Sequence, residues 1–280
     1  MAVGTLFVIA TPLGNPGDLA PRALEALRAS EVIFAEDTRT ARALLAAHGL
    51  ERPTHSCFDA NEAARAAEAG ALLAAGKTVG LVSEAGTPAV SDPGYRLVRA
   101  AIEAGARVVP IPGPSALLLA LIGSGLATDR FFFAGFPPRK PGPRRALFGT
   151  LRTLPATLIF YESPHRVAAT LADLRDALGD RPACVARELT KTHEEFVRGT
   201  LAALAERYAA DRPLGEITLV VGGAPEGAFA ESDDDLRARA TALLAAGQSA
   251  RDVAQQLAEE SGRPRRDVYE LVVAVKTRGV

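Results

Sequence analysis

The sequence predicts an α/β protein with two α/β domains, the first built on a parallel sheet and the second on a mixed sheet, followed by a small helical module. In the first part, continuous apolar runs alternate with segments of helical periodicity, as in a parallel sheet covered by helices on both faces. Farther along, strand-like runs come close together, which favours antiparallel pairing. The last part contains no strand-like run. The expected domains are residues 1–115, 116–227 and 228–280.

The first domain is predicted from four short apolar runs with helical segments after or between them. An apolar run of four to eight residues, bounded by turn residues, is typical of a buried strand. The expected strands are 6–10, 32–35, 79–82 and 107–111, and the expected helices are 21–29, 39–48, 61–75 and 95–104.

The second domain opens with an apolar core helix at 116–122. Its expected strands are 130–134, 157–161, 183–186, 195–198 and 217–221, with helices at 164–178 and 201–208. The strands between 183 and 198 are too close for helical crossovers, so part of this sheet is expected to be antiparallel.

A polar linker ending in Asp233, Asp234 and Asp235 precedes the third part. Helical segments are predicted at 236–246, 250–260 and 265–277, with Ser249 as a cap for the second of them. Gly262 and Pro264 form the turn before the last helix. Three short helices with a tight turn are compatible with a helix-turn-helix module, which binds nucleic acid or protein.

Composition and charge narrow the class of protein. The 280 residues are 48% hydrophobic and 23% charged, with a net charge of −1. A nearly neutral chain has no overall positive potential that would attract nucleic acid or anionic lipid, so any nucleic-acid surface must be a local patch of positive charge. Two distant cysteines, Cys57 and Cys184, give no disulfide framework and fit a reducing, cytoplasmic location. The first residues read as a strand rather than a signal peptide, and no apolar run is long enough to span a bilayer.

Four loops that follow predicted strands are rich in glycine, proline and small residues. Because parallel strands end at one edge of their sheet, these loops should surround a ligand there. Glycine lets backbone N–H groups approach a ligand, and proline fixes the turn. These neutral walls suit an adenosine, whereas a triphosphate would need a lysine that none of them contains. The loops are Thr11–Asn15, Glu36–Arg39, Ser83–Gly94 and Pro110–Ala116.

Several strings of the chain match one known family. They are GTLFVIATPLGNPGDL at 4–19, AEDTRTARALL at 35–45, SEAGTPAVSDPG at 83–94, PGPSA at 112–116, FYESPHR at 160–166, RELTKTHEE at 187–195 and GEITLVV at 215–221. By these strings the chain resembles the tetrapyrrole methylase superfamily, the class III S-adenosylmethionine (SAM) methyltransferases. Within it, the chain is similar to the branch that methylates the 2′-oxygen of a cytidine ribose in 16S rRNA of the small ribosomal subunit.

The resemblance implies the tetrapyrrole methylase fold, with a parallel Rossmann-like sheet, then a mixed sheet, and SAM bound between the two domains. The family's G-D-P triplet is Gly86-Thr87-Pro88 here, with threonine in place of aspartate, as is usual for the rRNA branch. The resemblance also implies a homodimer. The residues that it implies for cofactor binding are Pro12, Glu84, Ala85, Gly86, Thr87, Pro88, Asp92, Ser115, Ala116, Phe160, Tyr161, Leu189, Ile217 and Thr218.

Methylation of a ribose hydroxyl requires removal of its proton, so a general base is expected. The candidates are Asp37, Lys191, Glu188 and His165, with Glu36 and Glu162 also possible. Each has a structural alternative: Asp37 could cap a helix, Glu188 and Lys191 could form a salt bridge, and His165 could cap a helix or bind phosphate. The four histidines are isolated, so we expect no metal site.

The most basic stretch of the chain, 139–145, contains no acidic residue and is expected to form a loop that contacts RNA phosphates. The residues assigned to this role are Arg139, Lys140, Arg144 and Arg145, and the alternative is a solvated loop. A second basic cluster, at 263–266, lies in the helical module.

Three other functions remain open at this stage. A methyltransferase acting on a tetrapyrrole would share the fold and cofactor but would need a cleft for a macrocycle that carries carboxylates. A dinucleotide-dependent oxidoreductase is disfavoured because no G-x-G-x-x-G follows the first strand. A non-catalytic RNA-binding protein could retain the same fold.

Overall fold

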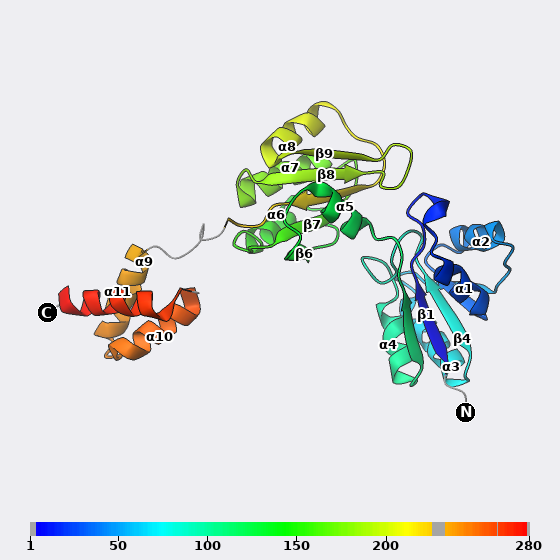
Figure 1. Cartoon of the computed structure of the whole chain (residues 1–280), viewed down its shortest axis with the longest axis horizontal. Coiled ribbons are helices and arrows are strands. Elements are labelled where there is room, and N and C mark those ends of the chain that lie inside the picture. Colours follow the sequence, from blue (N-terminus) through cyan, green and yellow to red (C-terminus); the bar gives the residue numbers. More distant parts are fainter. Residues whose placement is uncertain (1–3, 226–232, 262, 279–280) are drawn as a thin grey trace. The chain divides into compact units, whose positions relative to one another are not determined.

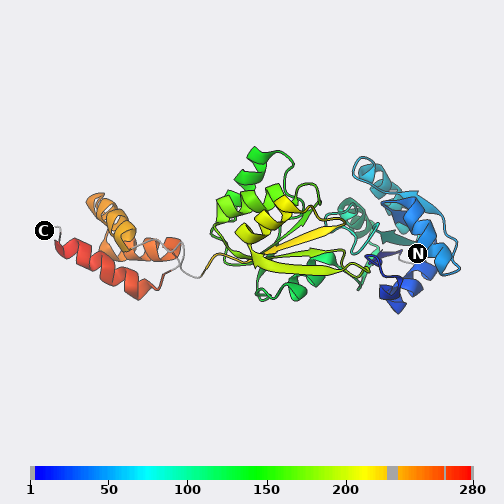
Figure 2. The same cartoon turned by 90° about the horizontal axis from the view of Figure 1, so that it is seen from above.

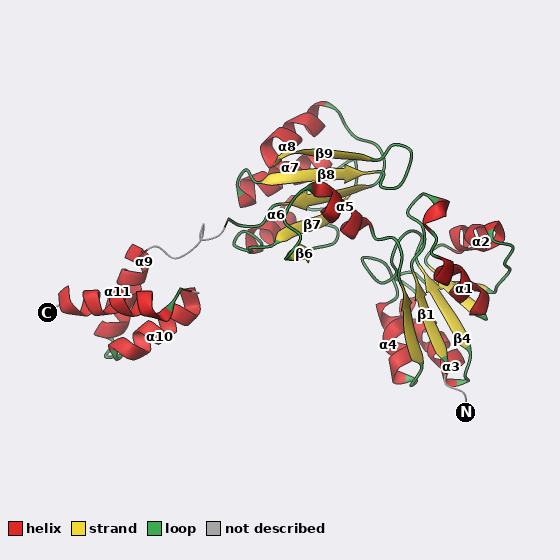
Figure 3. Ribbon diagram, viewed as in Figure 1, coloured by secondary structure: helices red, strands yellow, loops and turns green. Residues whose placement is uncertain are grey.

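The computed structural model describes residues 4–225, 233–261 and 263–278. The chain divides into two compact units. The larger comprises the described residues up to 152 together with 156–223, and the smaller comprises 153–155 and the described residues from 224 onward. The larger unit contains both sheets (Figures 1 and 3).

The first sheet is parallel throughout, with the strand order β3-β2-β4-β1-β5. Its apolar strands have cores on both faces, as the continuous hydrophobic runs predict. Leu6, Phe34 and Leu81 lie in one core, while Ile9 and Ile33 lie in the other. The strands are β1 (Thr5–Ile9), β2 (Val32–Ala35), β3 (Thr54–Ser56), β4 (Thr78–Val82) and β5 (Arg107–Ile111).

Two pairs of helices cover this sheet. Helices α3 (Glu62–Ala74) and α4 (Tyr95–Glu103) contribute Leu73 and Leu97 to the core of Leu6. Helices α1 (Pro21–Ala29) and α2 (Thr38–Ala47) contribute to the core of Ile9. The sequence did not predict β3, because this short edge strand, Thr-His-Ser, lacks an apolar run. A short 3₁₀ helix, η1 (Pro16–Asp18), follows β1.

The second sheet is mixed, as predicted, with the order β6-β7-β10-β8-β9. Only β6 and β7 pair in parallel; the other neighbours are antiparallel. Its strands are β6 (Phe131–Phe133), β7 (Thr157–Glu162), β8 (Pro182–Arg187), β9 (Glu195–Thr200) and β10 (Ile217–Val221). Helix α5 (Ala116–Ser124) packs Leu117 and Leu121 into one core with Ile159 and Val220.

The other helices of the second domain are α6 (Pro141–Thr150), α7 (Val167–Leu178) and α8 (Leu201–Ala210). Helix α6 corrects the prediction of a basic loop at 139–145. Proline in the first turn of a helix has a suitable φ and needs no hydrogen-bond partner, so the Pro-Gly-Pro sequence begins this helix. Phe148 of α6 packs edge-on against Phe160 of β7, with ring centroids 5.5 Å apart.

The smaller unit contains the three helices α9 (Asp233–Ala245), α10 (Ala250–Ser261) and α11 (Arg265–Arg278) (Figure 2). Their core includes Leu236, Val253, Leu257 and Val272. The three aspartates that were expected in a linker form the first turn of α9, where their negative charge stabilises the helix N-terminus. Ser249 accepts a hydrogen bond from the N–H of Asp252, as expected for a cap. Within the described part of the chain, none of the helices could cross a membrane.

A buried ion pair joins α6 to α7. Arg144 and Asp173 are both about 5% exposed, and Arg144 Nε donates to Asp173 Oδ2 at 2.8 Å. Arg145 Nε donates to the other oxygen, Oδ1, at 2.8 Å. Burial raises the pKa of Asp173, but the two arginines outweigh this effect and hold the pKa below its usual value.

We expect Asp173→Asn to destabilise the protein by about 3–5 kcal/mol, because it leaves the buried Arg144 guanidinium without its counter-charge. The free energy of unfolding in urea measures this loss. The control is Asp176→Asn, which removes an exposed carboxylate on the same helix that pairs with Arg175. Its effect should stay below about 1 kcal/mol. Equal stability of the two variants would contradict a structural role for the buried pair.

Candidate functional site at the carboxyl edge of the parallel sheet

Three loops at the carboxyl edge of the first sheet are joined by hydrogen bonds. Thr11, directly after β1, forms an isolated bridge with Gly86: Thr11 N donates to Gly86 O at 2.9 Å, and Gly86 N donates to Thr11 O at 3.1 Å. Thr87 Oγ1 donates to the carbonyl of Pro114 at 2.9 Å. The Ser83–Gly94 loop therefore connects the loops that follow β1 and β5.

The backbone of the Ser83–Gly94 loop is strained. Ala89 and Ser91 have φ angles of 65° and 62°, in the left-handed region that costs non-glycine residues about 1–2 kcal/mol each. Such strain persists only where the surroundings enforce it, and it is common at functional sites. Here the end of the loop is fixed by Glu62 Oε1, which accepts from the N–H groups of Gly94 at 2.8 Å and Arg96 at 3.0 Å.

A cavity of about 450 Å³ lies beside this loop, with walls from both α/β domains of the larger unit. Val90, from the loop, also packs against the hydrophobic core formed by α5 and the second sheet. The cavity is lined by Leu13, Glu36, Glu84, Ala85, Gly86, Thr87, Val90, Ser91, Asp92, Ser115, Ala116, Phe136, Tyr161, Glu162, Ser163, Pro164, Gly215, Glu216, Ile217 and Thr218.

Most of the residues that the family resemblance implied for the cofactor lie together on this cavity. They are Glu84, Ala85, Gly86, Thr87, Asp92, Ser115, Ala116, Tyr161, Ile217 and Thr218. Pro12, Pro88, Phe160 and Leu189 are not among the lining residues. Successive side chains of a strand point to opposite faces, so Phe160 points away from the face of Tyr161 and packs on Phe148. Leu189 is buried in the core around α5.

The sequence prediction missed other parts of the cavity wall. Phe136 was not predicted; it forms an aromatic pair with the predicted Tyr161, with ring centroids 5.5 Å apart. Gly215 and Glu216 come just before β10, and Ser163 and Pro164 come just after β7. Gly215, Glu216, Ser163 and Pro164 belong to the matched strings FYESPHR and GEITLVV, which could have identified them.

Asp37 lies at the N-terminus of α2 as a helix cap. Its carboxylate accepts from the N–H of Arg39 at 2.7 Å and pairs with the Arg39 guanidinium, also at 2.7 Å. These hydrogen bonds lower the pKa of Asp37 to about 2. A carboxylate with so low a pKa is a weak base, so the structure favours the capping alternative for Asp37.

Glu188 and Lys191 form the salt bridge that was their structural alternative. Lys191 Nζ lies 3.0 Å from Glu188 and 2.9 Å from Glu216. Burial lowers the pKa of Lys191, but the hydrogen bonds to Glu216 and Glu188 outweigh it and leave the pKa above its usual value. A protonated lysine cannot act as a base. His165 contacts Arg212 at 2.9 Å and does not line the cavity.

Glu162 is 2% exposed, and both oxygens of its carboxylate accept hydrogen bonds. Its Oε1 accepts from the N–H of Ser163 at 2.7 Å, and its Oε2 accepts from Thr170 Oγ1 at 2.6 Å. Arg166 lies 3.3 Å from the same carboxylate and donates to the carbonyl of Pro137 at 2.7 Å. This network fixes the turn after β7, so Glu162 has a positioning role in the cavity wall.

Glu36, Glu84 and Asp92 bring three carboxylates to one side of the cavity. Burial raises the pKa of Glu36, and the charges of Glu84 and Asp59 add to this effect. Burial together with the charge of Glu36 raises the pKa of Asp92 to about 7, although a hydrogen bond from Ser83 opposes the shift. The cavity therefore contains a carboxyl group whose pKa is well above the usual value for aspartate.

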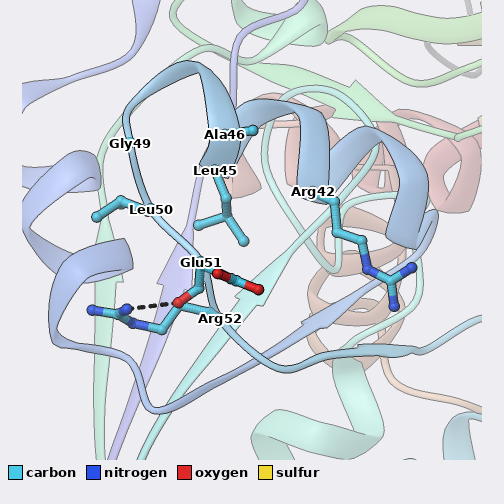
Figure 4. Close-up of a pocket in the computed structure, with 7 residues that line it drawn as sticks. All are labelled: Arg42, Leu45, Ala46, Gly49, Leu50, Glu51 and Arg52. Carbon is cyan, nitrogen blue, oxygen red and sulfur yellow. Dashed lines mark hydrogen bonds between the residues drawn. The ribbon is translucent and has the colours of Figure 1, made fainter.

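A second hollow, of about 500 Å³, lies where α2 ends and the chain turns toward β3 (Figure 4). Arg52 lies in its wall, but its guanidinium donates to the carbonyls of Arg28, Ser30 and Glu51. These bonds give Arg52 a structural role. The hollow lies at the opposite end of the strands from the edge where α/β sheets usually bind ligands.

The four arginine and lysine residues that the sequence assigned to RNA binding differ in their exposure and in their partners. Arg139 and Lys140 are exposed before α6. Arg145 is largely exposed but pairs with Asp173. Arg144 is buried in the ion pair with Asp173, so its guanidinium is not available to a phosphate in this structure. Within the described ranges, no cluster of three or more histidine, cysteine or acidic residues could hold a metal ion.

Comparisons with known proteins agree with this architecture. The model of the Tetrapyrrole (Corrin/Porphyrin) Methylases matches residues 5–205. The solved methyltransferase CobJ covers 80% of this chain and 95% of its own, with a TM-score of 0.58 and 20% identity, which is evidence of the fold alone.

Many curated relatives carry the name ribosomal RNA small subunit methyltransferase I, and two of them show how far the similarity extends. The one from Micromonospora olivasterospora is 48% identical over 96% of this chain and 86% of its own length. The one from Synechocystis is 46% identical over 99% of this chain and 100% of its own. The chain therefore belongs to the tetrapyrrole methylase family of SAM-dependent methyltransferases and, within it, to the ribosomal RNA small subunit methyltransferase I family.

Proposed function

We propose that this protein transfers the methyl group of SAM to the 2′-oxygen of a cytidine ribose in 16S rRNA of the small ribosomal subunit. The near full-length similarity to the ribosomal RNA methyltransferases supports the substrate. The observation that carries the proposal is the charge of the cavity. Glu36, Glu84 and Asp92 line it, and no ion pair within the described residues involves any of the three; Glu162 and Glu216 also line it but pair with Arg166 and Lys191.

The cavity fits a sulfonium nucleoside. The carboxylates that line it suit the positive charge of the sulfonium, and the aromatic and apolar side chains of Tyr161, Phe136 and Ile217 suit a nucleoside base. Gly86, at φ 80°, lets the backbone approach a ligand closely. When bound, SAM would supply a methyl group already activated for transfer; the protein would hold the acceptor in line and remove its proton.

The same charges disfavour the alternative functions. A tetrapyrrole that carries several carboxylates would be repelled by this acidic wall, and so would the pyrophosphate of a dinucleotide. A ribose hydroxyl is neutral and meets no such penalty. A protein that only binds RNA would have no need of a cavity suited to a cation. The ribosomal substrate implies that the enzyme works in the cytoplasm.

The decisive assay incubates the protein with methyl-labelled SAM and small ribosomal subunits from a strain that lacks this gene. We expect one labelled methyl group per subunit, recovered as 2′-O-methylcytidine after digestion of the RNA to nucleosides. Label on a base, or subunits left unlabelled, would reject the proposal. Subunits from the parent strain serve as the control, because their target site is already methylated.

We also propose that the enzyme acts as a homodimer, as the family resemblance implies. Leu118 and Ile122, one helical turn apart on α5, are 47% and 69% exposed, which is unusual for large apolar side chains. If a second copy covers this face, Ile122→Glu should shift the protein toward the monomer in analytical ultracentrifugation. Glu103→Gln, an exposed change on α4, is the control. A wild-type monomer would contradict the proposal.

Gly86→Val should abolish SAM binding while the fold survives. A Cβ at Gly86 would lie 2.9 Å from Leu13 Cδ2, and Leu13 also lines the cavity. The matched control is Gly105→Val: Gly105 has a similar φ of 69°, but open space surrounds its Cβ position. Both variants carry similar backbone strain, so calorimetry should find SAM binding lost only at Gly86. Normal SAM affinity in Gly86→Val would mean that the pocket is misplaced.

RNA binding is predicted to depend on the exposed pair Arg139 and Lys140. Each lost phosphate contact lowers the slope of log affinity against log salt by about 0.7–0.9. Replacing both by alanine should therefore lower that slope by about 1.4–1.8 units and weaken subunit binding, with SAM affinity unchanged. The control is Arg22→Ala with Arg42→Ala, which removes two exposed charges from α1 and α2. An unchanged slope would remove Arg139 and Lys140 from the RNA surface.

A further inference from the structure

The last helix of the smaller unit, α11, has one buried face and one exposed face. Val268, Leu271 and Val272 are buried in the core that α11 shares with α9 and α10. On the opposite side, four exposed residues follow one another at intervals of four, four and three positions, which places them along one face of an α-helix. These residues, which we call the α11 face, are Arg265, Tyr269, Val273 and Lys276.

The α11 face exposes an aromatic ring beside an aliphatic side chain. Tyr269 is 46% exposed and Val273 is 38% exposed, and no other large apolar side chain among the described residues of the smaller unit reaches such exposure. The two residues are one helical turn apart. An exposed aromatic ring offers a flat surface on which the base of an unpaired nucleotide can stack.

The same face carries two cations that have no carboxylate partner. Arg265 and Lys276 form no ion pair with any residue that the structure describes, whereas Arg266, beside the face, pairs with Glu270. Charge is also divided unevenly between the helices: α11 has four basic and two acidic residues, and α10 has one basic and three acidic. Arg265 lies one turn before Tyr269 and Lys276 two turns after it, so cations flank the ring on both sides along the helix.

We propose that the α11 face binds RNA of the small ribosomal subunit, with an unpaired base stacked on Tyr269 and phosphates held by Arg265 and Lys276. The inference rests on the proposed function and gives it a second RNA contact, on a compact unit other than the one that contains the cavity. Uncompensated cations beside an aromatic ring complement a polyanion that has exposed bases. The centre of a protein–protein interface, in contrast, is depleted of charged residues.

The α11 face should act on substrate affinity and leave the methyl-transfer step unchanged. None of its residues lines the cavity. Two contacts with RNA from one chain raise the effective concentration of each for the same subunit, so loss of one weakens the whole complex. We therefore expect variants of the α11 face to raise KM for small subunits, while kcat at saturating subunits and the affinity for SAM stay at their wild-type values.

Stacking is tested by Tyr269→Ala in the full chain, with Tyr269→Phe as the matched control. Affinity for unmethylated small subunits should fall about 5- to 150-fold in Tyr269→Ala, the range expected for loss of one stacked base. Tyr269→Phe retains the ring and should bind as the wild type does. Because the side chain is exposed, both variants should unfold in urea as the wild type does. Wild-type affinity in Tyr269→Ala, or equal weakening in both variants, would overturn the stacking role.

The phosphate contacts are tested by Arg265→Ala together with Lys276→Ala. The slope of log subunit affinity against log salt should fall by about 1.4–1.8 units. The control is Arg237→Ala with Arg251→Ala, which removes two exposed cations from α9 and α10 of the same unit and should keep the slope. Weaker binding with an unchanged slope would assign the α11 face to a ribosomal protein instead of RNA and overturn the inference.

Two further results separate this inference from its alternatives. A smaller oligomer in analytical ultracentrifugation of Tyr269→Ala would assign the α11 face to a second copy of the chain and overturn the RNA role. Failure of the proposed function has a different signature, because the wild type would then bind subunits without transferring label to them. The salt slopes would still decide on the α11 face in that case, and a wild type that does not bind subunits would overturn the inference directly.

Discussion

The hydrogen-bonded bridge between Thr11 and Gly86 is the contact on which the site depends. β1 and β4 are neighbours in the parallel sheet, so their following loops begin side by side, and the bridge holds them together beyond the strands. The Ser83–Gly94 loop begins at the end of β4. Its other end is held at the N-terminus of α4 by the hydrogen bond from Gly94 to Glu62, and its middle contacts the second domain through Val90. These restraints enforce the left-handed conformations at Ala89 and Ser91, and with them the position of Asp92.

The acidic groups around the cavity fall into two classes that differ in their partners. Asp37, Glu162 and Glu188 accept hydrogen bonds from backbone N–H groups or from arginine, lysine or threonine side chains, which commits them to structure. Glu36 accepts a hydrogen bond from the backbone of Glu84, and Asp92 accepts one from Ser83, but both lie close to further carboxylates and no ion pair among the described residues compensates them. Paired carboxylates stabilise the protein, whereas uncompensated ones raise its energy. They are useful only if a cation or a proton occupies the cavity during function.

Much of the fold could be predicted from the sequence because most strands are short apolar runs of typical strand length, and turns or helical segments separate these runs clearly. β3 could not, because Thr54–Ser56 is paired at the sheet edge by backbone bonds rather than by an apolar pattern. α6 could not, because two prolines and a glycine favour a turn until tertiary contacts, Phe148 on Phe160 and Arg144 on Asp173, stabilise a helix. For the site, motif strings located the cavity wall, but they could not show which polar groups were paired. Asp37 and Lys191 looked available as bases, and only their distances to Arg39, Glu188 and Glu216 show that they are paired.

The distribution of charge reconciles an acidic cavity with an RNA substrate. Glu36, Glu84 and Asp92 repel a phosphate, which disfavours entry of the RNA backbone into the cavity, while Arg139 and Lys140, the RNA contacts that we propose, are exposed and do not line it. A ribose hydroxyl is neutral and is the part of a nucleotide that such a cavity can admit without an electrostatic penalty. In the proposed reaction the positive charge of the donor offsets part of the charge of these carboxylates when it binds and so reduces the repulsion between them.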